Sequence, residues 1–222
     1  MGVTFLHAHA AHPDALQALA RANAELRAAA AKRAGFEPTL AFLYFSDHHA
    51  ARAEAMLGAL RAAWPGIAVA GGVGIGVAAS GVEYFDEPGL ALMLCDLRRE
   101  SFTLFHGRAP LARGDACAAL VHADPSTHDL AALIGELSDR VPTGYLFGGL
   151  ASSRARTLTL ADGVFEGGLS GVAFGRDVPL LSRVTQGCQP LGQPRRVTAA
   201  EGNLVLSLDG QPALPLWLAE LG

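Results

Sequence analysis

Residues 39–45 read TLAFLYF, an unbroken run of apolar side chains, and residues 46–64 follow directly as SDHHAARAEAMLGALRAAW. A strand with one solvent-exposed face alternates polar and apolar residues, so this run predicts a strand that is covered on both faces. In the second stretch apolar residues recur in steps of three and four, which predicts an amphipathic helix from Asp47 to Trp64. Together the two segments favour a layered fold built on a buried strand.

Two further helices are expected, from Asp14 to Lys32 and from Pro125 to Val141, because their leucines also share one helical face. Asp124 before Pro125 is a good N-cap and first-turn pair. The other expected strands span residues 3–8, 67–70, 82–85, 90–97, 101–106, 145–147, 157–160, 169–175, 179–184 and 203–208.

Strands greatly outnumber helices after residue 66. This argues against a Rossmann fold, since a doubly wound sheet needs a crossover helix after nearly every strand. We therefore predict a mixed α/β (α+β) fold, a layered sandwich of mixed sheets with helices outside.

The two halves of the sequence also share one pattern of segments. Each half has a helix, a Pro/Gly turn, a short apolar strand and a double glycine, Gly71-Gly72 in the first half and Gly148-Gly149 in the second. This pattern predicts a pseudo-twofold duplication with sub-repeats at residues 39–106 and 124–184, inside a single domain over residues 1–222. The alternative is two similar units that share common turn chemistry.

Composition excludes several classes of protein. Of the 222 residues, 50% are hydrophobic and 17% are charged, which excludes a disordered chain, and the net charge of −4 leaves no basic surface for nucleic acid. The apolar run at residues 67–79 is shorter than the roughly 20 residues that cross a bilayer, and no secretory signal begins the chain. Three widely spaced cysteines do not form a disulfide framework. We expect a cytoplasmic protein without nucleic-acid partners or membrane insertion.

Two glycine-rich stretches form the candidate ligand site. Glycine lets the backbone approach a ligand closely, and exposed amides in such loops can bind a carboxylate or another anion. The alternative is that these glycines only ease tight packing at strand ends. The residues expected at the site are Gly71, Gly72, Gly74, Gly148, Gly149, Ser152, Ser153 and Arg154.

The sequence contains partial matches to a cofactor motif and to a metal site. The formal G-x-G-x-x-A at residues 74–79 precedes an expected strand, whereas a dinucleotide site needs a helix there, so no cofactor is expected. His7 and His9 would share one face of a strand, as metal ligands could, with His12 nearby. No second cluster supplies carboxylates at recognisable spacing, and we expect no metal site.

No complete catalytic constellation is visible in the sequence. Ser170 fails the G-x-S-x-G spacing, and residues 126–129 (STHD) suggest capping chemistry in a helix's first turn. If the chain were an enzyme, Cys188 would be the most plausible nucleophile. We expect a binding module and no catalytic residues. The alternatives are a hydrolase- or amidase-like enzyme and a non-catalytic scaffold or dimerisation domain.

Several segments together resemble a known family. They are YLFGGLA at residues 145–151, QGCQPLG at 186–192 and LDGQPAL at 208–214. With the strand that ends at Ser46 and the helix after Asp124, they resemble the N-terminal region of the FIST domain. The resemblance implies an intracellular sensory domain of signal transduction that binds small ligands such as amino acids. FIST proteins usually continue into a C-terminal FIST region, so that region or a signalling output protein is the expected partner, and a chain ending at Gly222 is expected to be reduced or trimmed.

Overall fold

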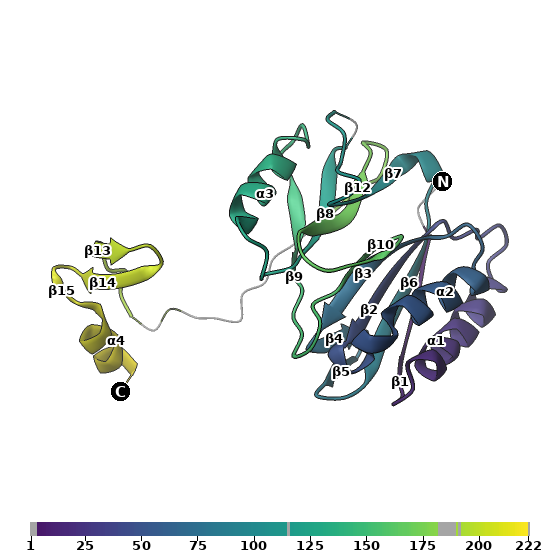
Figure 1. Ribbon diagram of the computed structural model, residues 1–222, viewed down its shortest axis with the longest axis horizontal. Helices are drawn as coiled ribbons and strands as arrows, with labels where there is room; N and C mark the ends of the chain where they lie inside the picture. The colour runs from purple at the N-terminus through teal and green to yellow at the C-terminus, as the bar shows by residue number, and fades with distance from the viewer. Residues whose placement is uncertain (1–3, 115, 182–189, 191, 222) are drawn as a thin grey trace. The chain divides into compact units, whose positions relative to one another are not determined.

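The computed structural model describes residues 4–114, 116–181, 190 and 192–221, and its contacts divide the chain into two compact units, residues 1–180 and 181–222. The single domain over residues 1–222 stays a prediction, and each unit is described by itself (Figure 1). Across the described residues, no helix combines the length and the apolar character that a membrane crossing requires.

The first unit alternates strands with a few helices. In chain order its elements are β1 (Thr4–Ala11), α1 (Ala15–Ala30), β2 (Leu40–Ser46), the 3-10 helix η1 (Asp47–Arg52), α2 (Ala53–Ala63), β3 (Ala68–Gly74), β4 (Gly76–Ala79), β5 (Val82–Phe85), β6 (Gly89–Asp96), the 3-10 turn η2 (Arg99–Ser101), β7 (Phe102–His106), β8 (Ala118–Ala123), α3 (Leu130–Ser138), β9 (Leu146–Leu150), β10 (Thr159–Ala161), β11 (Val164–Phe165) and β12 (Leu169–Phe174).

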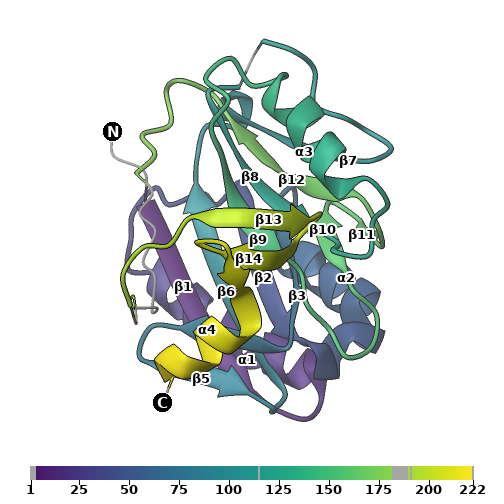
Figure 2. The ribbon, with the colours of Figure 1, turned by 90° about the vertical axis from the view of Figure 1, so that its left-hand side faces the viewer.

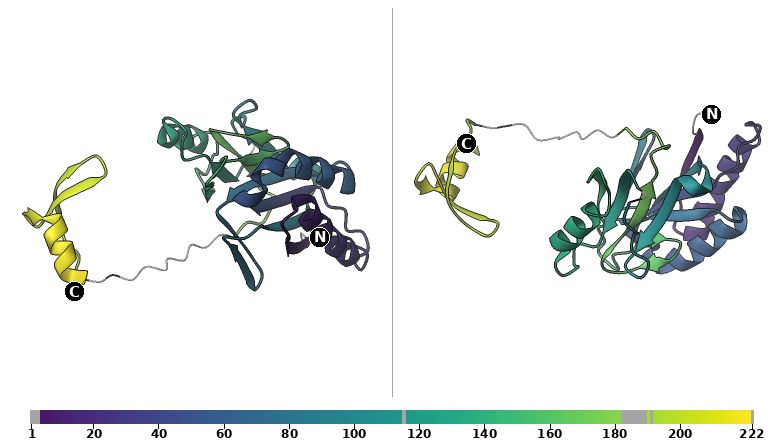
Figure 3. Two further views of the ribbon diagram at one scale, coloured as in Figure 1. Left: turned by 60° about the horizontal axis from the view of Figure 1, so that its bottom comes forward. Right: turned by 90° about the horizontal axis from the view of Figure 1, so that it is seen from above.

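These elements form a four-layered sandwich. The helices α1 and α2 pack on one face of a six-stranded sheet of order β1-β6-β2-β3-β10-β11, through residues such as Leu26, Leu43 and Leu60. The opposite face of that sheet packs on a four-stranded sheet of order β7-β12-β8-β9, with Phe42 and Phe174 in the shared core. The helix α3 covers the outer face of the four-stranded sheet, so the helices lie outside the paired sheets (Figure 3). The predicted sandwich of mixed sheets is confirmed.

The two sheets repeat one topology. In the larger sheet β2 pairs antiparallel with β6 and parallel with β3; in the smaller sheet β8 pairs antiparallel with β12 and parallel with β9. The strands β1 and β7 then flank β6 and β12, which gives the matching orders β1-β6-β2-β3 and β7-β12-β8-β9. The matching sets of strands begin at Thr4 and Phe102, whereas the expected sub-repeats begin at residues 39 and 124, and the duplication itself stays a prediction.

The first glycine of each double glycine is required by close packing against the neighbouring strand. Gly71 lies opposite Leu43 at φ +143°, and Gly148 lies opposite Val121 at φ +136°. A Cβ at either position would overlap the carbonyl oxygen of the facing strand residue. Because only glycine tolerates this approach, the two repeats need it at the same place.

Some expected elements differ in the structure. The helix α3 begins at Leu130 rather than Pro125, because the Asp124 carboxylate accepts hydrogen bonds from Ser126 and Gly167 and holds residues 124–129 in turns. The expected capping role of residues 126–129 in a helical first turn was therefore wrong. The expected helix at 47–64 opens with η1. The central strand β8 was missed because its alanines carry little strand signal.

The second unit is a small three-stranded antiparallel sheet followed by a helix (Figure 2). Its strands are β13 (Val197–Glu201), β14 (Leu204–Leu208) and β15 (Gln211–Pro212), and its helix is α4 (Ala213–Leu221). The expected tight turn at Asp209-Gly210 is confirmed, with φ values of +50° and +78°. Of the strand expected at residues 179–184, residues 179–181 form no strand and the remainder lie outside the described residues.

Candidate functional site

One cavity in the first unit brings the two double-glycine strands together. Its volume is about 280 Å³, and it takes residues from both sheets. The strand β3 supplies one glycine, β9 supplies the other pair, and β2 and β8 supply a tyrosine and a histidine. The lining residues are Tyr44, Gly72, Val73, Leu120, His122, Gly148, Gly149, Leu150 and Ala151.

Tyr44 and His122 form the polar centre of this cavity. Tyr44 lies opposite Gly72 on β3, and His122 lies opposite Gly149 on β9, so the two side chains hold equivalent places in the repeats. The Tyr44 hydroxyl and His122 Nε2 are 2.8 Å apart, and the rings meet edge to face. The pair therefore joins the two sheets by a hydrogen bond.

Burial keeps both members of this pair uncharged. It lowers the pKa of His122 to about 4, because an imidazolium loses its hydration there. Burial likewise raises the pKa of the Tyr44 hydroxyl, which keeps its proton. If that proton is donated to His122 Nε2, the imidazole carries its own proton on Nδ1. His122 then has a neutral N–H donor at Nδ1.

Among the described residues, three buried polar atoms on or next to the lining residues have no protein partner. They are His122 Nδ1, Ser170 Oγ and Thr159 Oγ1. Ser170 faces His122 across the β8–β12 pair, and Thr159 faces Gly72 across the β3–β10 pair. Because directly opposed side chains project from the same face of a sheet, both hydroxyls lie on the faces that form the inter-sheet layer.

The structure divides the sequence-predicted site residues into two groups. Gly72, Gly148 and Gly149 line the cavity. Gly71 does not, because its backbone packs against Leu43, and Gly74 ends β3 beyond the lining residues.

The remaining three predicted residues follow Ala151 and form a short connecting loop. Ser152 Oγ accepts a hydrogen bond from the Ile75 amide at 3.2 Å, so it ties this loop to the end of β3. Ser153 Oγ accepts from the Ala155 amide. Neither residue lines the cavity.

Arg154 is engaged in ion pairs instead of being open to a ligand. Its Nε and backbone amide both donate to Asp47 Oδ2 at 2.9 Å, and Nη1 pairs with Asp86. The Asp47 side chain is only 6% exposed. Although burial opposes its ionisation, the hydrogen bonds from Arg154 hold the pKa of Asp47 below its usual value. Arg154 therefore anchors the loop after β9 to η1 and to the turn after β5.

Sequence reasoning missed Tyr44, His122, Ser170 and Thr159 as a group. Tyr44 lies within an apolar run, and His122 lies in the alanine-rich strand β8, whose sequence carries little strand signal. A signal existed for these two residues: Tyr44 and His122 are polar residues in the apolar strands that precede the double glycines. Only the pairing of β8 with β9 makes that signal meaningful, because it sets His122 beside Gly149.

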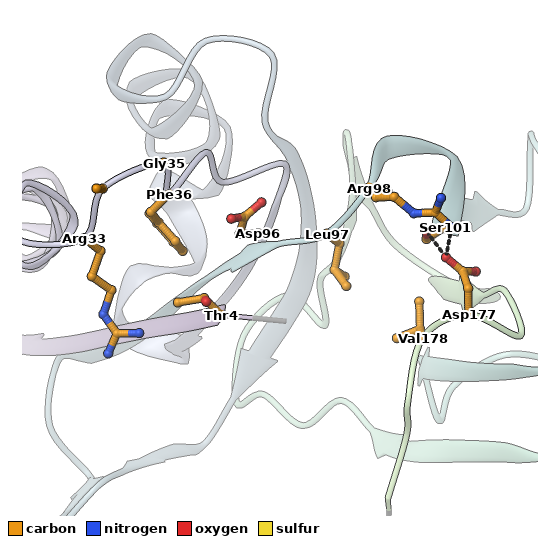
Figure 4. Close-up of a pocket in the computed structure, with 11 residues that line it drawn as sticks. Thr4, Arg33, Gly35, Phe36, Asp96, Leu97, Arg98, Ser101, Asp177 and Val178 are labelled. Carbon is orange, nitrogen blue, oxygen red and sulfur yellow. Dashed lines mark hydrogen bonds and ion pairs between the residues drawn. The ribbon is translucent and has the colours of Figure 1, made fainter. Parts of the chain in front are cut away.

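Two other hollows of the first unit differ from this cavity in their lining. One, of about 590 Å³, includes Arg98, Ser101 and Asp177 in its lining, and these polar groups already pair, because Arg98 and Ser101 both donate to Asp177 (Figure 4). An apolar cavity of about 210 Å³ lies between the sheets and shares Tyr44 and Leu120 with the double-glycine cavity. The double-glycine cavity alone among these three includes a lining side chain with an unpaired buried polar atom.

The histidine and nucleophile candidates have separate positions. His7 and His9 do share one face of β1, but His9 Nδ1 is hydrogen-bonded to the Tyr84 hydroxyl. Within the described ranges no three His, Cys, Asp or Glu residues group as metal ligands would. Ser170 Oγ and His122 Nδ1 make no hydrogen bond with each other. Cys188 lies outside the described residues.

Comparison with known proteins matches most of the chain. The family model of the FIST N domain matches residues 39–211. An uncharacterized protein of Mycobacterium tuberculosis (strain ATCC 25618 / H37Rv) is 33% identical over 216 residues, covering 91% of this chain and 55% of its own length. An uncharacterized protein of Mycobacterium bovis (strain ATCC BAA-935 / AF2122/97) is 33% identical over 218 residues with the same coverage. The chain thus spans about half the length of these relatives.

Proposed function

The chain belongs to the FIST family, a family of sensory domains, and from this premise we propose that it binds a small ligand in the cavity between its two sheets. The observation that carries the proposal is the convergence of both double-glycine strands on one cavity with a buried Tyr–His pair. Ligand sites in proteins are mostly apolar hollows with a few converging polar groups, and this cavity has that composition.

Gly149 supports a ligand role more directly than the other glycines. No atom lies within 4 Å of the Cβ that a side chain would place there. At Gly71 and Gly148, by contrast, the neighbouring strand leaves no room for a Cβ, so glycine is required for packing. Gly149 pairs with His122, so a side chain at this position would project from the same face as the imidazole. The absent side chain leaves open the space that a ligand would fill.

The family resemblance favours amino acids and small carboxylates as the first ligands to examine. It also favours a C-terminal FIST region or a signalling output protein as the partner that receives the signal. Since the chain spans about half of its relatives, we propose this output role for the whole protein rather than for the described units alone.

A thermal-shift screen of amino acids and small carboxylates tests the proposal. The expected result is at least one compound that raises the melting temperature, because a ligand that binds only the folded state stabilises it. Gly149→Leu should abolish the shift by filling the cavity. Gly58→Ala is the matched control, since Gly58 lies in α2, away from the cavity, with open space around its Cβ. A flat screen, or a shift that persists in Gly149→Leu, contradicts the proposal.

A further inference from the structure

Resting on that proposed function, we infer that the inner wall of the cavity recognises an uncharged hydrogen-bonding group, such as an amide, a phenol or an alcohol, on a largely apolar ligand. The residues assigned to this recognition are Tyr44 and His122, which line the cavity, together with Ser170 and Thr159, which are outside the lining and face the lining residues His122 and Gly72 across their strand pairs. A charged end of the same ligand would remain at the cavity mouth, where Leu150 is exposed.

The four side chains lie in two facing rows. In the larger sheet Tyr44, Gly72 and Thr159 are successive cross-strand neighbours, and Phe165 follows them. In the smaller sheet the corresponding row is His106, Ser170, His122 and Gly149, listed from β7 to β9.

Two contacts join these rows. Tyr44 is hydrogen-bonded to His122, and Phe165 stacks on His106 with ring centroids 4.1 Å apart. Ser170 lies between His106 and His122 in its row, and Thr159 lies between Tyr44 and Phe165 in the other. Both hydroxyls are therefore held between the two contacts, in the same part of the inter-sheet layer.

The unpaired atoms in this layer point to a missing hydrogen-bonding partner. His122 is 7% exposed, and Ser170 and Thr159 are each 1% exposed, yet His122 Nδ1 and both hydroxyls lack a protein partner. Buried polar groups in folded proteins nearly always have partners, because an unpaired one loses its hydration without compensation. A single ligand group with donor and acceptor capacity, such as an amide, could bond to more than one of them.

The electrostatic environment of the inner wall disfavours the binding of a charged ligand group there. None of the described residues that line the cavity carries a fixed charge, and burial keeps both Tyr44 and His122 neutral. The nearest cation along the chain, Arg154, is already paired with Asp47 and Asp86. An ion bound against the inner wall would lose its hydration without a counter-charge, which is costly.

The adjoining apolar cavity supplies the rest of the specificity. It shares Tyr44 and Leu120 with the ligand cavity and is lined by aromatic and aliphatic side chains, among them Phe42, Met93 and Phe147. If the ligand carries an aromatic or aliphatic group next to its neutral polar group, that apolar group would contact the lining of this adjoining cavity, on the far side of Tyr44.

Matched probes test the inference by nuclear magnetic resonance of protein labelled with ¹⁵N-histidine. Benzamide and benzoate share a shape and differ in charge. Benzamide should bind and shift the His122 Nδ1 resonance while the ring stays neutral, whereas benzoate should leave that resonance unchanged. The inference is overturned if benzoate moves both ring nitrogens toward the imidazolium, or if benzamide leaves His122 unaffected. Either of those results leaves the amino acid screen, and with it the proposed function, standing.

A pair of threonine substitutions separates ligand recognition from structural support. Thr159→Val removes an unpaired hydroxyl, so it should keep the melting temperature or raise it and weaken benzamide binding by about tenfold. Thr39→Val is the control, because the Thr39 hydroxyl is bonded to both the carbonyl and the amide of Leu97. It should lower the melting temperature and leave benzamide affinity unchanged. The opposite pattern, with Thr159→Val destabilised and its affinity retained, overturns the inference.

Discussion

Tyr44 and His122 hold equivalent positions in the two repeated sheets and are hydrogen-bonded to each other between them, with Tyr44 Oη 2.8 Å from His122 Nε2. The repeat places each side chain opposite the second glycine of its double glycine. Packing the two sheets face to face then sets the tyrosine of one repeat against the histidine of the other. The contact links the matching topology of the two sheets to the polar centre of the cavity.

Removing the Tyr44 hydroxyl should destabilise the protein. In Tyr44→Phe the buried imidazole would lose the partner of Nε2 while Nδ1 is already unpaired, so we expect a loss of about 1–3 kcal/mol in the free energy of unfolding. Urea denaturation at pH 7 measures it. The half-exposed Tyr145 gives the control Tyr145→Phe, expected to stay within about 0.5 kcal/mol of the parent. Equal effects in the two variants would contradict the assigned role.

Stability should fall as the pH drops below about 6.5. His122 has a folded-state pKa of about 4, below its ordinary value of 6.5, because burial disfavours its protonated form. The unfolded chain therefore takes up this proton first, and the stabilisation present above pH 6.5 is lost as the pH falls toward 4. Its size is on the order of 3 kcal/mol.

Unfolding measured by denaturant between pH 4 and pH 7 checks this dependence. His122→Gln should show a shallower pH profile than the parent, because glutamine does not titrate. Burial also lowers the pKa of His49, so some slope should remain in this variant. His128→Gln, at a side chain that is 94% exposed, should keep the parent profile. Identical profiles for His122→Gln and the parent would refute the prediction.

The first glycine of each pair should tolerate no side chain. Gly71→Ala and Gly148→Ala each combine a positive φ with overlap against the facing carbonyl oxygen, so we expect losses of about 3 kcal/mol or more, or failure to fold. Gly58→Ala in α2 should be neutral or stabilising by up to about 1 kcal/mol. Circular dichroism and urea unfolding of the three variants measure these differences. A parent-like Gly71→Ala would show that the strands can separate at little cost.

Arg154 should control the order of the loop that closes the cavity edge. Arg154→Ala leaves the buried Asp47 carboxylate without its main partner, so the amides of residues 151–156 should exchange with solvent faster by hydrogen–deuterium exchange. Arg156→Ala breaks only the exposed pair with Glu166 and should leave that protection nearly unchanged. Unchanged exchange in Arg154→Ala would mean that hydrogen bonds such as Ser152 to Ile75 hold the loop alone.

The sequence by itself determined the layered architecture. The strand at residues 39–45 and the helix after it could be predicted because hydrophobic periodicity is a local property, present in each segment independently of the others. The matching glycine pattern was visible for a similar reason: each sheet needs glycine where one strand approaches a carbonyl of the next, so Gly71 and Gly148 recur in the same local pattern.

Only the tertiary structure decided which residues meet. Tyr44 and His122 are 78 positions apart, and no local pattern states that their sheets pack with these two faces together. The same holds for Arg154, which was expected at the ligand site but is paired with Asp47 and Asp86 in the folded chain. Local propensity fixes an element and its apolar face, but the chemistry of a cavity depends on non-local contacts between elements. For that reason the glycines could be named in advance, whereas the polar centre could not.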